Sequence, residues 1–382
     1  MKRFFCAGLA LILAFFTFSG ALAEEEETEP ETAEITGEET ILDEETEEQD
    51  SGDPMIEEEV LLTEDGEVLP GDEEISVEKP ENRTAQADSA SEEGDFPELN
   101  GQGFLESGEF VYENDEEGLW RYASETLWVE VRRIIQEKPA RTWYEAEIRC
   151  AEGGEFPHMI PWNPEKWTDR DYPYKIARTN RTVIAVSSDY AWWRYVKKQR
   201  TGIIVRNGEL ISEKTRKSMA DGFPNLDTLA ILPDGDMQAF FSSEKTGEEY
   251  LKMGAVDVLS FGPWLIRDGQ LNEKGLKKYG TAGGAERVAV GMAEKGHYWF
   301  MMLEGRIKRS RGDNVSFLTE KLQEKGCQVA FNLDGGQSAC ILFMGHQLCK
   351  MDDKPHNLSS RRTADILGVG TSELVRTLDD PW

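Results

Sequence analysis

The sequence has little that could bind a transition metal or cross a membrane. Its 382 residues include only four histidines and five cysteines, and no two cysteines form a CxxC pair. This spacing argues against a zinc site. The apolar stretch from Gly8 to Phe18 is short for a membrane span. No Pro/Ser-rich linker divides the chain after residue 97, and the roughly 285 residues there suffice for one large domain.

Residues 1–23 have the features of a secretory signal peptide. Lys2 and Arg3 supply positive charge, the apolar stretch follows, and Ala21-Leu22-Ala23 offers small residues to a signal peptidase. Cys6 precedes the apolar stretch, so it cannot be a lipoprotein acylation site. We therefore predict a secreted or extracytoplasmic protein that has no stable membrane span after cleavage. Association with the cell envelope is one form of this prediction.

Basic and aromatic residues are almost absent from residues 24–97. About 31 acidic residues there face only Lys79 and Arg83, and the first aromatic residue is Phe96. The segment carries nearly all of the formal charge of −32, and residues 98–382 carry only about −5. Such a composition cannot offset the entropy lost on folding. We predict a disordered acidic spacer over 24–97, a folded domain over 98–382, and no nucleic-acid partner.

Four cysteines, Cys150, Cys327, Cys340 and Cys349, remain after removal of the signal peptide. An even number in an exported protein permits two disulfides with three connectivities. A turn at Gly345-His346 would place Cys340 and Cys349 diagonally across a hairpin rather than opposite each other. The sequence leaves their redox state open.

Short strands separated by turn residues dominate the folded region. Alternating residues over Trp120–Arg133 and Trp143–Ile148 predict half-buried strands, and Asn207-Gly208 predicts a tight hairpin turn. Phe156–Trp167 has no clear period and is expected to be a long surface loop. The clearest helix is Val315–Lys325, with Asn314 as its N-cap. The fold class predicted is α+β, a single domain with a large, mostly antiparallel or mixed β-sheet core and few helices.

Two strand ends carry an acid among small polar residues. The apolar run Val329–Phe331 leads into Asn332-Leu333-Asp334-Gly335-Gly336-Gln337-Ser338, and Thr182–Val186 leads into Ser187-Ser188-Asp189-Tyr190. Acid, amide, hydroxyl and flexible backbone NH groups at one strand end suit a polar anionic ligand. A tight Asp-Gly hairpin turn is the alternative explanation of the first motif.

Taken in chain order, six stretches resemble the phosphodiester glycosidase family, whose animal member uncovers the mannose 6-phosphate signal. They are Ala185–Tyr190, Arg206-Asn207-Gly208, Phe261–Gly269, Glu286–Gly291, Asn332–Ser338 and Arg362–Leu367. The resemblance covers about Leu119 to Gly368. It implies an exported hydrolase that cleaves a sugar–phosphate bond, such as GlcNAc linked through phosphate to a second alcohol. Its partner would be a carbohydrate phosphodiester of an envelope or exopolysaccharide glycan.

Cleavage of such a bond needs a carboxylate at the sugar and positive charge at the phosphate. We predict Asp334 as base or nucleophile, Asp189 as its partner carboxylate, and Arg287 as a phosphate ligand, because guanidinium matches phosphate oxygens bidentately. In an alternative arrangement, Asp189 and Asp334 hold a divalent cation, and oxygen ligands favour calcium or magnesium. No other cofactor is predicted.

Substrate binding is assigned to the residues around this centre. Asn332 and Ser338 would orient sugar hydroxyls, and Arg362 would assist Arg287 at the phosphate. The backbone of Gly335 and Gly336 could form a small anion nest.

Four positions depart from the family pattern. Ser187 stands where the family has Asn, Gln337 where it has Gly, and Glu304 where Asp is usual. Glu286-Arg287-Val288 replaces a stretch similar to Pro-Arg-Thr. These departures keep open an alternative to the enzyme, namely a catalytically weak or inactive envelope module that binds anionic glycans.

Overall fold

Three antiparallel β-sheets make up most of the described chain. The structure is a computed structural model that describes residues 83–87, 96–191, 194, 201–214, 226–279, 284–351 and 361–380. The predicted signal peptide and most of the predicted acidic spacer lie outside these residues. All strand pairs described are antiparallel, and four α-helices accompany them in the described part of the chain. The predicted α+β class with an antiparallel sheet core is therefore confirmed.

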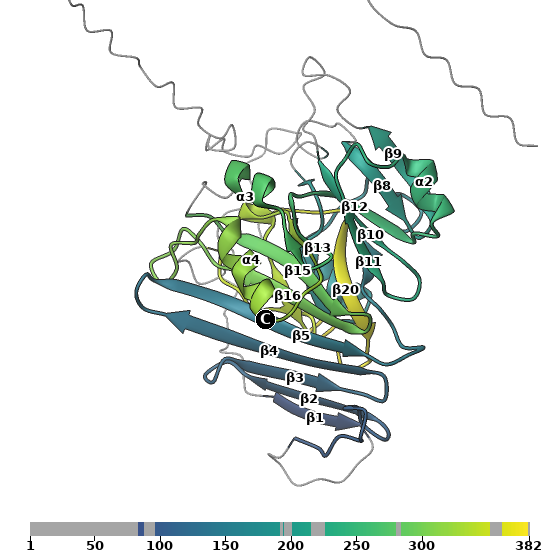
Figure 1. Cartoon of the computed structure of the whole chain (residues 1–382). Helices are drawn as coiled ribbons and strands as arrows, with labels where there is room; N and C mark the ends of the chain where they lie inside the picture. The colour runs from purple at the N-terminus through teal and green to yellow at the C-terminus, as the bar shows by residue number, and fades with distance from the viewer. Residues whose placement is uncertain are drawn as a thin grey trace, which may run out of the picture. The chain divides into compact units, whose positions relative to one another are not determined.

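The largest sheet has ten strands in the order β1-β2-β3-β4-β5-β16-β15-β17-β13-β14, and Figure 1 shows β1 to β5 side by side. The strands are β1 (Arg83–Ala87), β2 (Glu109–Asn114), β3 (Leu119–Ala123), β4 (Leu127–Gln136), β5 (Arg141–Cys150), β13 (Trp264–Arg267), β14 (Gln270–Leu271), β15 (Arg287–Glu294), β16 (His297–Leu303) and β17 (Val329–Leu333). β1 lies within the predicted acidic spacer, in a stretch without acidic residues, and pairs with β2.

Two smaller sheets have five strands each. The first, in the order β11-β10-β12-β8-β9, contains β8 (Gly202–Arg206), β9 (Glu209–Lys214), β10 (Asp227–Ile231), β11 (Met237–Phe240) and β12 (Asp257–Phe261). The second, in the order β19-β18-β7-β20-β6, contains β6 (His158–Pro161), β7 (Thr182–Val186), β18 (Ile341–Phe343), β19 (His346–Gln347) and β20 (Asp365–Thr371). The Asn207-Gly208 hairpin between β8 and β9 is confirmed, with positive φ at both residues.

The helices are α1 (Pro173–Thr179), α2 (Gly247–Lys252), α3 (Glu273–Tyr279) and α4 (Val315–Glu324). The Asn314 side chain accepts a hydrogen bond from the Ser316 NH at 2.9 Å, which confirms the predicted N-cap of α4. Figure 1 shows α4 over β15 and β16, where Leu318 and Leu322 are buried among side chains of the large sheet. No described helix is long and apolar enough to cross a bilayer.

The main core lies between the large sheet and the sheet that contains β7. Tyr144, Phe300 and Phe331 of the large sheet belong to one buried cluster with Ile184 of β7 and Phe343 of β18. Such fully buried aromatic and branched side chains contribute about 1.5–3 kcal/mol each. The packing of the two sheets therefore fixes the end of β7 against the end of β17.

Two predicted elements differ from the structure. Trp120–Arg133 forms β3 and β4, two strands of a hairpin rather than one element, because Ser124 and its neighbours turn the chain. The predicted loop Phe156–Trp167 contains β6, which pairs with β20.

The register predicted for the cysteine hairpin was wrong. The turn residues are Met344 and Gly345, both with positive φ, which is the two-residue turn that suits strand twist. Phe343 therefore pairs with His346, and the Leu348 NH donates to the Ile341 carbonyl at 3.0 Å. This register places Cys340 directly opposite Cys349. All four cysteines of the domain are buried and free.

Candidate active site

The two acid-bearing strand ends meet in the structure. Beyond β17, the Asp334 NH donates to the Ser188 carbonyl at 3.2 Å. The Ser187 hydroxyl donates to the Asp334 carbonyl at 2.8 Å. Ser187, the residue that departs from the family pattern, thus holds the backbone of Asp334. The Ser187 side chain thus links the end of β7 to the end of β17, whereas the Ser188 hydroxyl contacts Asp189 and Asp365.

The Asp189 carboxylate is fully engaged. It is 2 % exposed and pairs with Arg194 and, at 3.1 Å, with Arg206. Its other oxygen accepts from the Ser260 NH at 2.8 Å. Burial alone would raise the pKa of Asp189, but the Arg194 and Arg206 guanidiniums outweigh it and hold that pKa at about 2. Asp189 is therefore an ion-pair anchor that stays charged.

Asp365 at the start of β20 extends this ion-pair network. Its carboxylate accepts from Arg206 Nε at 2.7 Å and from Trp167 Nε1 at 3.1 Å, and it also contacts the Ser188 hydroxyl. Arg206 comes from the last position of β8, so the network joins the two five-stranded sheets. Trp167 reaches this network from the connection between β6 and α1.

Asp334 lies in a different environment. It is 2 % exposed, and its Oδ2 accepts from the Ala191 NH at 3.0 Å. The nearest guanidinium, that of Arg361, is 3.8 Å away and donates to the Ser338 hydroxyl at 2.9 Å. Burial raises the pKa of Asp334, and Arg361, the Ala191 NH and Ser338 oppose that rise only in part. The protonated form of this carboxyl is therefore favoured more than that of an exposed aspartic acid.

The other residues of the β17 motif pack closely around its backbone. A Cβ on Gly335 would lie 2.5 Å from the Glu286 carbonyl oxygen, so no other residue fits there. The Gly336 NH donates to that same oxygen at 3.2 Å, and this contact occupies one NH of the predicted anion nest. Asn332 donates to the Gly262 carbonyl at 2.8 Å, while its buried Oδ1 has no hydrogen-bond partner among the described residues.

The predicted phosphate ligands are separated. Arg287 begins β15, and the register of β15 with β17 pairs the next residue, Val288, with Leu333, so Arg287 lies at the same edge as Asp334. Its Nε donates to the Asp313 carbonyl at 3.2 Å. Arg362 is exposed and lies over the Tyr172 ring at 5.1 Å. Arg361, which sequence reasoning passed over, is the arginine beside Asp334.

The side chains do not fit a shared metal between Asp189 and Asp334. Both oxygens of Asp189 already accept hydrogen bonds from Arg194, Arg206 or the Ser260 NH. A cation would have to replace two arginines that carry the same charge. In the part of the chain that the structure describes, no three His, Cys, Asp or Glu side chains gather as a metal-binding group.

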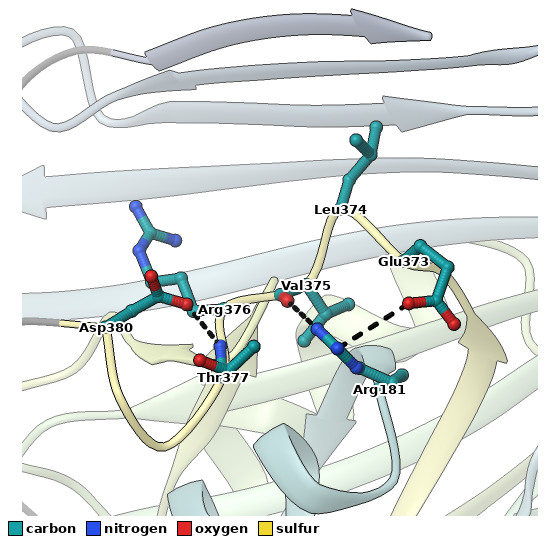
Figure 2. Close-up of a pocket in the computed structure, with 7 residues that line it drawn as sticks. All are labelled: Arg181, Glu373, Leu374, Val375, Arg376, Thr377 and Asp380. Carbon is teal, nitrogen blue, oxygen red and sulfur yellow. Dashed lines mark hydrogen bonds and ion pairs between the residues drawn. The ribbon is translucent and has the colours of Figure 1, made fainter.

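A polar hollow of about 430 Å3 lies at the other end of β7 (Figure 2). Arg181, which precedes β7, pairs with Glu373 at 3.5 Å and donates to the Val375 carbonyl at 2.8 Å. Arg376 forms a bidentate ion pair with Glu113 at 2.7–2.8 Å. These arginines are engaged with the protein itself, and β7 separates them from Asp189.

A comparison with known families assigns the chain to a class of protein. Residues 175–370, just over half of the chain, match the phosphodiester glycosidase family, and the chain belongs to that family. The resemblance found in the sequence is thereby confirmed. The matched range includes Asp189, Arg287, Asp334 and Arg361, and membership indicates a hydrolase of the glycosidase type.

The chain resembles solved structures of other proteins. The catalytic domain of zebrafish N-acetylglucosamine-1-phosphodiester alpha-N-acetylglucosaminidase, auto-inhibited by its pro-peptide, has a TM-score of 0.51 at 18% identity, over 65% of this chain and 85% of that chain. This likeness shows a shared fold. A hypothetical protein from Synechocystis has a TM-score of 0.44 at 13% identity, over 65% of this chain and 63% of that one.

One sequence relative comes from Bacillus subtilis (strain 168). The SPbeta prophage-derived uncharacterized protein YomE is 24% identical over 187 residues, which are 49% of this chain and 28% of that protein. The match thus spans less than a third of that relative's length.

Proposed function

We propose that this protein hydrolyses the bond between a sugar and a phosphodiester, with GlcNAc-1-phosphodiesters of envelope or exopolysaccharide glycans as the substrate class. The observation that carries the proposal is the Asp334 carboxyl, buried beside Arg361 on a tightly packed Gly-Gly loop. Membership of the phosphodiester glycosidase family and the activity for which the zebrafish relative is named support the choice of bond. Export, predicted from residues 1–23, belongs to the same proposal.

Asp334 is the residue that we assign to water activation at the sugar. A base works best when its pKa lies near the working pH, and burial moves the pKa of Asp334 in that direction. Arg361 at 3.8 Å opposes this rise and favours the ionised form, which is the form that accepts a proton. Asp189, held by two arginines, has no free oxygen for this task, and we propose that it fixes the strand end instead.

The phosphate needs positive charge, because the leaving monoester carries off the electrons of the broken bond. Arg361 lies 3.8 Å from Asp334, and Arg287 begins β15 at the sheet edge where Asp334 follows β17. A guanidinium group binds two phosphate oxygens at once, and we assign both arginines to the phosphate. Asn332, whose Oδ1 is buried and unpaired among the described residues, supplies an acceptor for a sugar hydroxyl.

The test is a product assay with the methyl diester of GlcNAc α-1-phosphate. We expect wild-type protein to release free GlcNAc and methyl phosphate, and Asp334→Asn to lose at least about a hundredfold in rate, the usual contribution of a general base. Asp268→Asn is the control, because it makes the same chemical change on an exposed turn with positive φ that Asn tolerates.

Three outcomes would contradict the proposal. Full activity of Asp334→Asn removes the assigned base. Release of GlcNAc 1-phosphate instead of GlcNAc means that the other P–O bond is cut. Binding of the diester without any product favours the inactive glycan-binding module that Ser187 and Gln337 suggest.

A further inference from the structure

Glu286 is a buried carboxylic acid without a hydrogen-bond donor on one of its oxygens. The residue is 3 % exposed, and its Oε2 has no hydrogen-bond partner among the described residues. The nearest cation to it is Arg306, whose Nε lies 3.6 Å away, beyond hydrogen-bond distance. A buried polar atom left unpaired costs about 1–3 kcal/mol. The fold tolerates this cost at the edge that carries Asp334.

Three glycines hold the backbone at Glu286. A Cβ on Gly305 would lie 2.5 Å from the Glu286 nitrogen, and one on Gly335 would lie 2.5 Å from the Glu286 carbonyl oxygen. A Cβ on Gly312 would collide with the Ala285 carbonyl oxygen. Three separate chain segments thus approach this backbone more closely than any side chain allows. The position of Glu286 is fixed, while its Oε2 has no hydrogen-bond donor among the described residues.

The neighbours of Glu286 belong to the proposed active site. Its carbonyl accepts from the Gly336 NH, two residues after Asp334. The next residue in the chain is Arg287. Arg306 itself has φ +57°, a conformation that costs a non-glycine residue about 1–3 kcal/mol and that clusters at functional sites. The Arg306 side chain is 54% exposed and thus accessible from solvent.

Glu304 shows what a structural carboxylate looks like in the same place. Arg287 pairs with Leu303 across β15 and β16, so Glu286 and Glu304 flank the ends of neighbouring strands. Glu304 is fully buried, but it accepts from Arg309 Nε at 2.7 Å, the Lys350 NH at 2.7 Å and the Tyr144 hydroxyl at 3.2 Å. Glu304 is saturated by protein donors, whereas Glu286 is available to a ligand.

We propose that Glu286 is the proton donor of the site and that Arg306 binds the phosphate beside it. The inference rests on the proposed phosphodiester glycosidase function and adds its second carboxyl group. A general acid must hold its proton at the working pH, and burial raises the pKa of Glu286 against the opposing charges of Arg306 and Arg287. Two carboxyl groups, one acidic and one basic, are what glycoside hydrolysis generally uses.

Hydrolysis transfers the sugar from the phosphate oxygen to water. Water attacks the anomeric carbon and gives a proton to Asp334, while the bond from that carbon to the phosphate oxygen breaks and its electron pair stays on that oxygen. Glu286 gives its proton to the same oxygen, and the products are the free sugar and the phosphate monoester. Asp334 then loses its proton to solvent and Glu286 regains one, which restores the starting state.

The experiment compares Glu286→Gln with Glu304→Gln in the full chain, with the methyl diester of GlcNAc α-1-phosphate as substrate. We expect Glu286→Gln to lower kcat about a hundredfold and to abolish the fall in rate toward high pH, because glutamine has no proton to give. Its Tm should stay the same or rise, since no protein hydrogen bond to Oε2 is lost. Glu304→Gln should lower Tm and keep the wild-type shape of the pH profile.

The outcomes separate the two proposals. If Asp334→Asn is inactive but Glu286→Gln keeps more than half of the wild-type rate, only the role of Glu286 is wrong. A Glu286→Gln protein that loses rate and Tm together, with an unchanged pH profile, shows a structural residue and also overturns it. If wild-type protein releases no sugar at all, the proposed function fails and Glu286 falls with it.

Discussion

Asp189 and Asp334 follow buried strands of two different sheets in the same manner, yet the structure surrounds their carboxyl groups differently. Asp189 accepts from two arginines and a backbone NH, and its pKa is held at about 2. Asp334 has one backbone NH at 3.0 Å and an arginine at 3.8 Å, and burial raises its pKa. The difference teaches that one sequence pattern, a strand that ends in an acid, serves two purposes here: one acid holds the strands and the other remains reactive.

The sharpest way to break this comparison is to neutralise each acid in turn and measure stability. Asp189→Asn leaves the buried Arg194 charge without a carboxylate partner and leaves Arg206 with Asp365 alone, so we expect a loss of about 3–5 kcal/mol in the free energy of unfolding. Asp334→Asn removes a buried charge and keeps an oxygen for the Ala191 NH, so its stability should be unchanged or higher. Urea unfolding of the two proteins measures both values, and equal losses would show that both acids are structural.

Much of this architecture can be predicted from local sequence. The hairpin at Asn207-Gly208, the helix after Asn314 and the strands that lead into Asp189 and Asp334 all depend on residues close in the chain. These predictions were right because turn chemistry and helix capping are local. Even the meeting of the two acid-bearing strand ends was implied by the resemblance to a family.

The interactions that distinguish the two acids could not be predicted in this way. Arg206 and Asp365 are 159 residues apart in the chain, and only the arrangement of the sheets brings them together. Successive residues of an extended segment point to opposite sides. Which of Arg361 and Arg362 lies beside Asp334 therefore depends on how the chain turns into β20. Whether Glu286 Oε2 has a hydrogen-bond donor depends on the segments that surround it, and the residue type alone does not predict this.

Arg361 and Arg362 are adjacent in the chain, and replacing each of them tests which one acts on Asp334. We expect Arg361→Ala to lower kcat/KM about tenfold to a hundredfold, because a lost contact to a charged group costs about 1.5–3 kcal/mol. Without this guanidinium the pKa of Asp334 rises further, so the acid limb of the pH–rate profile should move to higher pH. Arg362→Ala, the matched control, removes an exposed side chain stacked on Tyr172 and should leave both quantities nearly unchanged. The reverse result would restore Arg362 as the phosphate ligand.

The smallest expected effect is a pH-dependent difference in stability between wild-type protein and Glu286→Gln. Burial raises the pKa of Glu286 in the folded protein, whereas the pKa of a glutamate in an unfolded chain is about 4.3. The stability associated with its protonated form is thus fully present below that pH and is lost as the pH rises through the higher folded value. Each unit of pKa difference is worth about 1.4 kcal/mol.

Glutamine cannot ionise, so the advantage of Glu286→Gln over wild type in the free energy of unfolding should grow as the pH rises from about 4 through the raised pKa of Glu286 in the folded protein. Asp334 contributes a pH dependence of the same sign, but both proteins share it and it cancels in the difference. Parallel stability curves would mean that Glu286 titrates normally and is paired in solution. A widening gap, together with the stability lost by Asp189→Asn, would establish that this edge of the sheets separates carboxylates that hold the fold from carboxyl groups that the fold leaves free to react.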